Sequence, residues 1–329
     1  MATINDVATM AGVSTATVSR ALNGVASVDP ELCARVVSAA KELGYQPNGP
    51  ARNLRRQETA VLGLIISDVA NPFFTAIARG VEDVAQAVGY SVVLCNTDED
   101  AAKERRYLDV AIQERVAGVI MSPTDSASNA DVLREHGIPV VAVDRPLAGS
   151  DRVLVDTRMA AEQATKHLLD QGYRRIGCVA GPSGVQTADD RLAGYADALV
   201  AAGVEHEPRL VRHAEYRGAG AHGATLALRQ QPDPPDALLI ANSSLAIGAL
   251  EACHELGLRP GKDIGLVAFD DVPWAKLLDP PLTVVAQPAY DIGAVATQLL
   301  LARIGDNSKP PSTTTLNATL IERASSRRG

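Results

Sequence analysis

The stretch Ile4–Asn23, INDVATMAGVSTATVSRALN, decides how the first fifty residues fold. Its apolar residues recur at spacings of three and four, which is typical of one helix face. Gly12 is suited to end this helix, and Ser14 can cap the next one. The run Thr15–Leu22 then directs an apolar face inward, formed by Val18, Ala21 and Leu22. Two short helices joined by a glycine turn predict a helix-turn-helix, whose second helix enters the major groove of DNA.

The order of residues in this stretch matches a specific sequence pattern. The pattern D-V-A-x-x-A-G-V-S-x-x-T-V-S-R-x-L-N, from Asp6 to Asn23, resembles the DNA-binding headpiece of the lactose-repressor (LacI/GalR) family of bacterial transcription regulators. A helical hairpin inside a larger core is the alternative. The resemblance implies double-stranded, pseudo-palindromic operator DNA as a partner, and two recognition helices on one duplex require a homodimer. We expect base contacts from Thr15, Ala16 and Arg20, and phosphate contacts from Thr17, Ser19, Asn23 and Tyr45.

A third helix over Pro30–Leu43 closes the headpiece, and a short polar segment follows it. The stretch Gly49–Arg56, GPARNLRR, is too short to form a stable helix alone. It resembles the hinge helix of the family, which implies that Leu54 wedges into the minor groove. The remaining DNA contacts expected from this segment come from Asn48, Arg52 and Arg55. A solvated linker is the alternative.

The charge of the chain is unevenly distributed. The 329 residues carry a formal net charge of −8, yet residues 1–57 hold six Lys and Arg against four Asp and Glu. A mildly basic head on an acidic body fits one DNA-facing end. The sequence has no apolar run of about 18 residues and no signal peptide at its start, so we expect a cytoplasmic protein with no membrane partner.

From Val61 onward, buried strands alternate with helices about every 25 residues, which predicts parallel sheets covered on both faces. Two such blocks follow one another and resemble the periplasmic-binding-protein-like core of the same family. The fold class is therefore α/β, with a three-helix helix-turn-helix headpiece and hinge helix before two parallel-sheet lobes. We expect a headpiece over 1–47 and a hinge over 48–59. An N-terminal lobe over 60–160 and a C-terminal lobe over 161–290 should follow, and the segment 291–325 should return to the N-terminal lobe. A last strand is expected over Thr315–Glu322.

Ligands of parallel sheets collect beyond the carboxyl ends of the strands. Asp144 and Arg145 follow one strand, Asn242 and Asp270 follow two others, and the NPFF stretch follows the first. Carboxylates, an amide and a guanidinium suit sugar hydroxyls, and an aromatic ring suits the apolar face of a sugar. Together with the family motifs, this predicts a small-molecule effector held by Phe73, Phe74, Asp144, Arg145, Arg191, Asn242, Asp270 and Gln287. Ser243 stands where the family usually has an aspartate.

Other functions fit less well. The stretch Gly218–Gly223 matches G-x-G-x-x-G, but the next strand ends without the acid that a dinucleotide site requires. The sequence has no nucleophile elbow, no Walker loop and no metal-ligand spacing, so we expect no enzyme, no cofactor and no metal. A transport receptor or a cytosolic sugar enzyme are the rival interpretations. A sugar is the first expectation for the effector and a nucleobase or nucleoside the second, and either release or promotion of DNA binding stays open.

Overall fold

The computed structural model describes residues 2–22, 28–45, 59–124, 130–216 and 218–328. The chain divides into two units, Met1–Thr59 and Ala60–Gly329. Asn23, Asn48, Arg52, Leu54 and Arg55 of the expected DNA-binding set lie outside the described residues.

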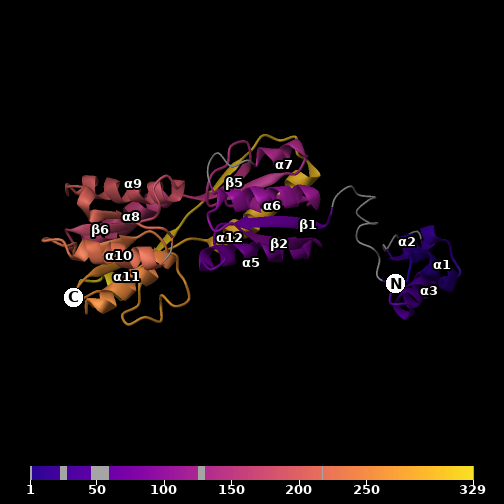
Figure 1. Cartoon of the computed structure of the whole chain (residues 1–329), viewed down its shortest axis with the longest axis horizontal. Helices are drawn as coiled ribbons and strands as arrows, with labels where there is room; N and C mark the ends of the chain where they lie inside the picture. The colour runs from indigo at the N-terminus through magenta and orange to yellow at the C-terminus, as the bar shows by residue number, and fades with distance from the viewer. Residues whose placement is uncertain (1, 23–27, 46–58, 125–129, 217, 329) are drawn as a thin grey trace. The chain divides into compact units, whose positions relative to one another are not determined.

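The described part of the N-terminal unit holds three short helices (Figure 1): α1 (Ile4–Ala11), α2 (Thr15–Leu22) and α3 (Pro30–Glu42). Val7, Val18 and Val36 are fully buried at the centre of their shared core. A core of this size is marginal alone, so the helix ends matter. Ser14 accepts a hydrogen bond from the Thr17 amide at 3.1 Å, as the sequence predicts.

Six parallel strands form the sheet of the first lobe, in the order β11-β5-β4-β3-β1-β2. Their bounds are β1 (Val61–Ile66), β2 (Ser91–Asn96), β3 (Gly118–Met121), β4 (Val140–Val143), β5 (Asp151–Val155) and β11 (Thr313–Leu316). One face is covered by α5 (Pro72–Ala87) and α12 (Ala289–Gly305), and the other by α6 (Ala101–Gln113) and α7 (Asp131–Glu135). The central strands are therefore buried on both faces, which explains why their sequences are continuous runs of apolar residues.

The helices α5 and α12 cross at two glycines. A Cβ on Gly293 would lie 2.1 Å from the carbonyl oxygen of Ile77, and a Cβ on Gly80 would lie 2.1 Å from that of Tyr290. Both positions therefore require glycine for the two backbones to approach. This crossing fixes the late helix α12 to the first lobe, although more than two hundred residues separate it from α5.

The second lobe repeats the design with the order β12-β10-β9-β8-β6-β7. Its strands are β6 (Ile176–Ala180), β7 (Val211–His213), β8 (Ala237–Ile240), β9 (Gly265–Phe269), β10 (Thr283–Ala286) and β12 (Thr319–Ile321). Its helices are α8 (Thr157–Asp170), α9 (Gln186–Ala201), α10 (Gly218–Arg229) and α11 (Ser243–Glu255). The first two cover one face and the last two the other. The strands are parallel except that β12 runs antiparallel to β10.

The end of the chain differs from the expectation. The single strand expected over Thr315–Glu322 is two strands in two sheets, since β11 pairs with β5 and β12 pairs with β10. The segment 291–325 therefore does not return to the first lobe as a whole, because its last part belongs to the second. Half-buried and exposed residues alternate without a break from Thr313 to Leu320, so the pattern gives no sign of the crossing. The helix α8 begins at Thr157, before the expected boundary at 160, and already contacts the second lobe at Arg158, which pairs with Asp197 of α9.

No helix among the described residues is long and apolar enough to cross a membrane.

Candidate functional site: a recognition helix and a cavity between two lobes

The outer surface of α2 carries the residues expected to read DNA. Thr15, Ala16 and Arg20 are exposed, whereas Val18 and Ala21 are buried on the opposite face. This arrangement is what an amphipathic recognition helix requires.

The residues expected to hold phosphates are less accessible. Thr17 and Ser19 are half-buried, and the Thr17 hydroxyl lies 2.9 Å from that of Ser14. Tyr45 packs against the core of the three helices, and its amide donates to the Ala40 carbonyl at 2.8 Å. Tyr45 is therefore fixed to the headpiece just after α3.

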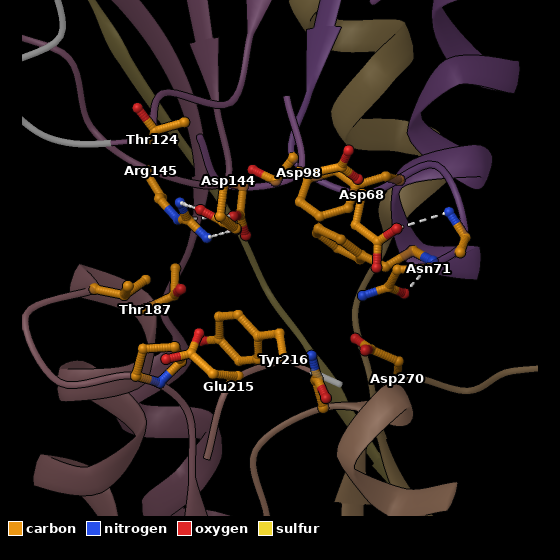
Figure 2. Close-up of a pocket in the computed structure, with 18 of the residues that line it drawn as sticks. Asp68, Asn71, Asp98, Thr124, Asp144, Arg145, Thr187, Glu215, Tyr216 and Asp270 are labelled. Atoms are coloured by element: carbon orange, nitrogen blue, oxygen red, sulfur yellow. Dashed lines mark hydrogen bonds and ion pairs between the residues drawn. The ribbon is translucent and has the colours of Figure 1, made fainter. Parts of the chain in front are cut away.

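A cavity of about 530 Å³ lies between the two lobes of the second unit (Figure 2). All eight residues expected to bind an effector line it: Phe73, Phe74, Asp144, Arg145, Arg191, Asn242, Asp270 and Gln287. They come from both sheets and lie beyond the carboxyl ends of strands or at the helix starts that follow. The structure thus brings together side chains that are more than two hundred residues apart in the sequence.

The aromatic wall belongs to the first lobe. Asn71 caps α5 by accepting a hydrogen bond from the Phe73 amide at 3.0 Å, and Pro72 occupies the first helical position. The rings of Phe73 and Phe74 meet edge to face, with centroids 5.2 Å apart. Both rings are largely buried, and they present an apolar surface on which a sugar face can stack.

Arg145 is the cationic centre of the first-lobe wall. Its two terminal nitrogens each donate to an oxygen of Glu99 at 2.6 Å, and its Nε lies 3.5 Å from Asp144 Oδ2. Burial favours the neutral form, but the hydrogen bonds of Glu99 and the charge of Asp144 outweigh it and raise the pKa of Arg145. Burial raises the pKa of Asp144, which Arg145 and Arg191 partly oppose. Arg145 therefore stays charged, whereas Asp144 is easier to protonate than an ordinary aspartate.

Arg191 is the matching cation of the second lobe. Its Nη1 donates to the Ala241 carbonyl at 2.6 Å, and its guanidinium carbon lies 4.4 Å from the centroid of the Phe269 ring. One turn later in α9, a Cβ on Gly194 would lie 2.0 Å from the Arg158 carbonyl oxygen. Gly194 therefore lets α8 and α9 approach, which holds Arg191 at the cavity.

Asp270 organises the floor of the cavity. Its carboxylate accepts hydrogen bonds from Gln287 Nε2 at 2.8 Å and from the Ser243 amide at 3.2 Å. Asn242 caps α11 by accepting from the Leu245 amide at 2.8 Å. The Ser243 hydroxyl, at the position that departs from the family pattern, lies 3.4 Å from Asn71 Oδ1 and so joins the two lobes.

Five buried polar atoms of this cavity have no hydrogen-bond partner among the residues that the structure describes. They are Thr124 Oγ1, Arg145 Nε, Arg191 Nε, Tyr216 Oη and Gln287 Oε1. An unsatisfied buried donor or acceptor costs about 1–3 kcal/mol. Hydroxyl groups, which donate and accept, would satisfy all five atoms.

The sequence reasoning missed part of the lining: Asp98, Glu99, Thr124, Thr187, Glu215 and Tyr216. Four of these residues follow β2 or β7, the strands at one edge of each sheet. The strand-end rule would have found them if it had been applied to the edge strands as well. The pairing of Glu99 with Arg145 gives no signal in the sequence.

Comparison with known proteins identifies the family. The ribose operon repressor of Halalkalibacterium halodurans is 41% identical over 310 residues, which cover 92% of this chain and 91% of that protein. This chain belongs to the lacI family of bacterial regulatory proteins. The model of the lacI-family regulatory domain matches residues 3–48, and that of the periplasmic binding protein-like domain matches residues 165–326. The predicted fold class and the prediction of a regulator rather than an enzyme are confirmed.

Two solved structures of lacI-family proteins extend the comparison. The lac repressor dimer bound to operator and an anti-inducer gives a TM-score of 0.89 at 26% identity, covering 99% of both chains. A regulator from Enterococcus faecium with bound ribose gives a TM-score of 0.73 at 25% identity, covering 80% of this chain and 98% of that one.

Proposed function

We propose that this lacI-family chain is a transcriptional repressor that binds a pseudo-palindromic operator as a homodimer. We further propose that a sugar of the ribose class binds between the two lobes and lowers the affinity for DNA. The observation that carries the proposal is the cavity in which five buried polar atoms lack hydrogen-bond partners among the described residues, beside an aromatic wall. A relative named for the ribose operon and a neighbour with bound ribose support the choice of sugar.

The DNA-binding end is proposed from α2 and the segment after it. The exposed Arg20 can offer two donors to one guanine, and the exposed methyl of Ala16 can contact a thymine methyl. Residues 1–47 would serve as the headpiece and residues 48–59 as the hinge. Within the hinge, Leu54 would enter the minor groove, while Arg52 and Arg55 would neutralise phosphates. A repressor of this kind acts in the cytoplasm.

The effector would act by joining the lobes. Arg145, Asp144 and Phe74 belong to the first lobe, whereas Arg191 and Asp270 belong to the second. A ligand that contacts both sets stabilises one arrangement of the lobes over others. The chain crosses between the lobes at three places, after β5, β10 and β11. Closure of the lobes on a ligand would therefore bend these three connections and move each lobe as a rigid body.

Calorimetric titration of the purified full-length chain tests the sugar part of the proposal. D-ribose should bind, and the same protein should retard a fragment that carries its own promoter in a gel-shift assay. Binding of adenosine but not ribose would replace the proposed effector by a nucleoside. Failure of the protein to bind any promoter fragment, with or without sugars, would overturn the proposed repressor.

A further inference from the structure

The ion pair of Glu99 and Arg145 bears on which ligands the cavity can hold. Arg145 could bind an anionic group of a ligand, but Glu99 already accepts its hydrogen bonds. Both terminal nitrogens of Arg145 donate to the two oxygens of Glu99 at 2.6 Å, in the two-pronged geometry of strong arginine–carboxylate pairs. Arg145 is 5% exposed, whereas 31% of the Glu99 side chain is exposed, so the pair joins a buried guanidinium to a partly exposed carboxylate. Glu99 therefore neutralises the only guanidinium that the described part of the first lobe places in the cavity.

The loop that carries Glu99 is built to hold it there. Asp98 and Glu99 have φ angles of 54° and 59°, in the left-handed region that side chains other than Gly and Asn rarely adopt. Asn96 fixes the base of this loop by accepting from the Val69 amide at 2.9 Å and donating to Asp98 at 2.8 Å. With this backbone conformation the Glu99 carboxylate reaches Arg145, although the Glu99 side chain stays partly exposed to solvent.

The charge of the cavity points the same way. Six carboxylates but two guanidiniums are found among the described residues that line it: Asp68, Asp98, Glu99, Asp144, Glu215 and Asp270 against Arg145 and Arg191. Charges interact more strongly in such a partly dry site than in water. An anionic group on a ligand would meet an excess of negative charge.

The unsatisfied atoms call for a neutral partner instead. Arg145 and Arg191 are both 5% exposed, and the Nε donor of each has no hydrogen-bond partner in the described part of the chain. The acceptor oxygen of Gln287 has none there either. A polyol supplies hydroxyls that accept from the donors and donate to the acceptor. The phosphate group of an ester would replace one hydroxyl by oxygens that only accept, and it would bring at least one more negative charge.

We infer that Glu99 is a specificity residue, which neutralises Arg145 so that the cavity accepts an uncharged sugar and rejects its phosphate ester. The inference rests on the proposed function, since it concerns the ligand of the same cavity. It assigns to Glu99 a role in ligand choice in addition to any part in folding.

Calorimetric titration with D-ribose and with D-ribose 5-phosphate tests this role on the full-length chain and on Glu99→Gln. The natural protein should bind ribose and bind the phosphate ester at least about tenfold more weakly, because like charges meet in the cavity. Glu99→Gln frees the Arg145 fork, so the ratio of the two affinities should move toward the ester by about tenfold or more. If Glu99 had only a structural role, its replacement would lower the affinities for both ligands by the same factor.

Glu207→Gln is the matched control. Glu207 receives a comparable fork from Arg175 but does not line the cavity, so the affinity ratio should stay at the natural value. Thermal melting without ligand shows whether each variant folds, and Glu99→Ala repeats the test if the glutamine variant does not. An unchanged ratio in a folded Glu99 variant, or equal binding of both ligands by the natural protein, would overturn the inference while leaving the proposed function intact. If the natural protein binds neither ligand, the proposed effector and this inference both fail.

Discussion

Replacing Arg191 by methionine is the sharpest perturbation of the cavity. Methionine keeps an unbranched apolar stem against Phe269 but removes the guanidinium that lies 4.4 Å from the ring centroid. The Nε of Arg191 is buried and finds no hydrogen-bond partner among the residues described, so it is available to a ligand oxygen. A hydrogen bond from a charged donor contributes about 1.5–3 kcal/mol. The variant should therefore bind ribose about tenfold to about 150-fold more weakly.

The same substitution should affect folding much less. The Ala241 carbonyl loses the donor that now lies at 2.6 Å, which destabilises the fold. In return, a buried cation that is only partly hydrogen-bonded is removed, which relieves its desolvation cost. We expect the free energy of unfolding to change by less than about 2 kcal/mol.

Calorimetry with ribose and urea unfolding measure the two effects separately. Arg158→Met is the control, since Arg158 is exposed on α8, pairs with Asp197 and does not line the cavity. It should leave the ribose affinity within about twofold of the natural value, because a surface pair contributes little. Unchanged ribose binding by Arg191→Met would refute the placement of Arg191 at the ligand.

Three further predictions follow from the described contacts. Burial lowers the pKa of the His167 imidazole, so the unfolded chain takes up this proton at a higher pH than the folded chain does. The melting temperature should therefore fall as the pH drops below 6.5, and it should fall less in His167→Gln. Asp151→Asn should lower the free energy of unfolding by about 3 kcal/mol in urea, because the nearly buried carboxylate pairs with Arg303 and accepts two hydrogen bonds from Ser312; a loss under about 1 kcal/mol would contradict this. Arg20→Ala should cost about 1–3 kcal/mol of discrimination between the promoter site and unrelated DNA, measured by fluorescence anisotropy, and equal losses on both DNAs would remove Arg20 from base readout.

The sequence predicts most of this fold because its signals are local. The run at Val61 is apolar on both faces, and strands of that kind belong in the middle of a covered parallel sheet. Strand ends meet at one edge of such a sheet, so the positions of Asn242 and Asp270 along the chain assign both to the end of the second sheet, and that of Asp144 to the end of the first. The resemblance to a two-lobed core then brings the two sheet ends to one cavity.

What the sequence does not predict depends on long-range pairing. The strands β11 and β12 share one alternating pattern yet pair with different sheets, and only the register with β5 and β10 separates them. The fork between Arg145 and Glu99 joins residues 46 positions apart and depends on a left-handed turn at a non-glycine residue. Neither feature has a compositional cue, since both follow from how the elements pack.

The central claim is that one chain couples operator binding to sugar binding between its lobes. Anisotropy titration of a labelled promoter fragment with the full-length protein, with and without saturating D-ribose, measures that coupling. Coupling of about 1–3 kcal/mol predicts that ribose raises the Kd for DNA by about 5-fold to about 150-fold, and that the DNA weakens ribose binding by the same factor. A Kd for the promoter that is unchanged by ribose, although ribose binds, would contradict the account.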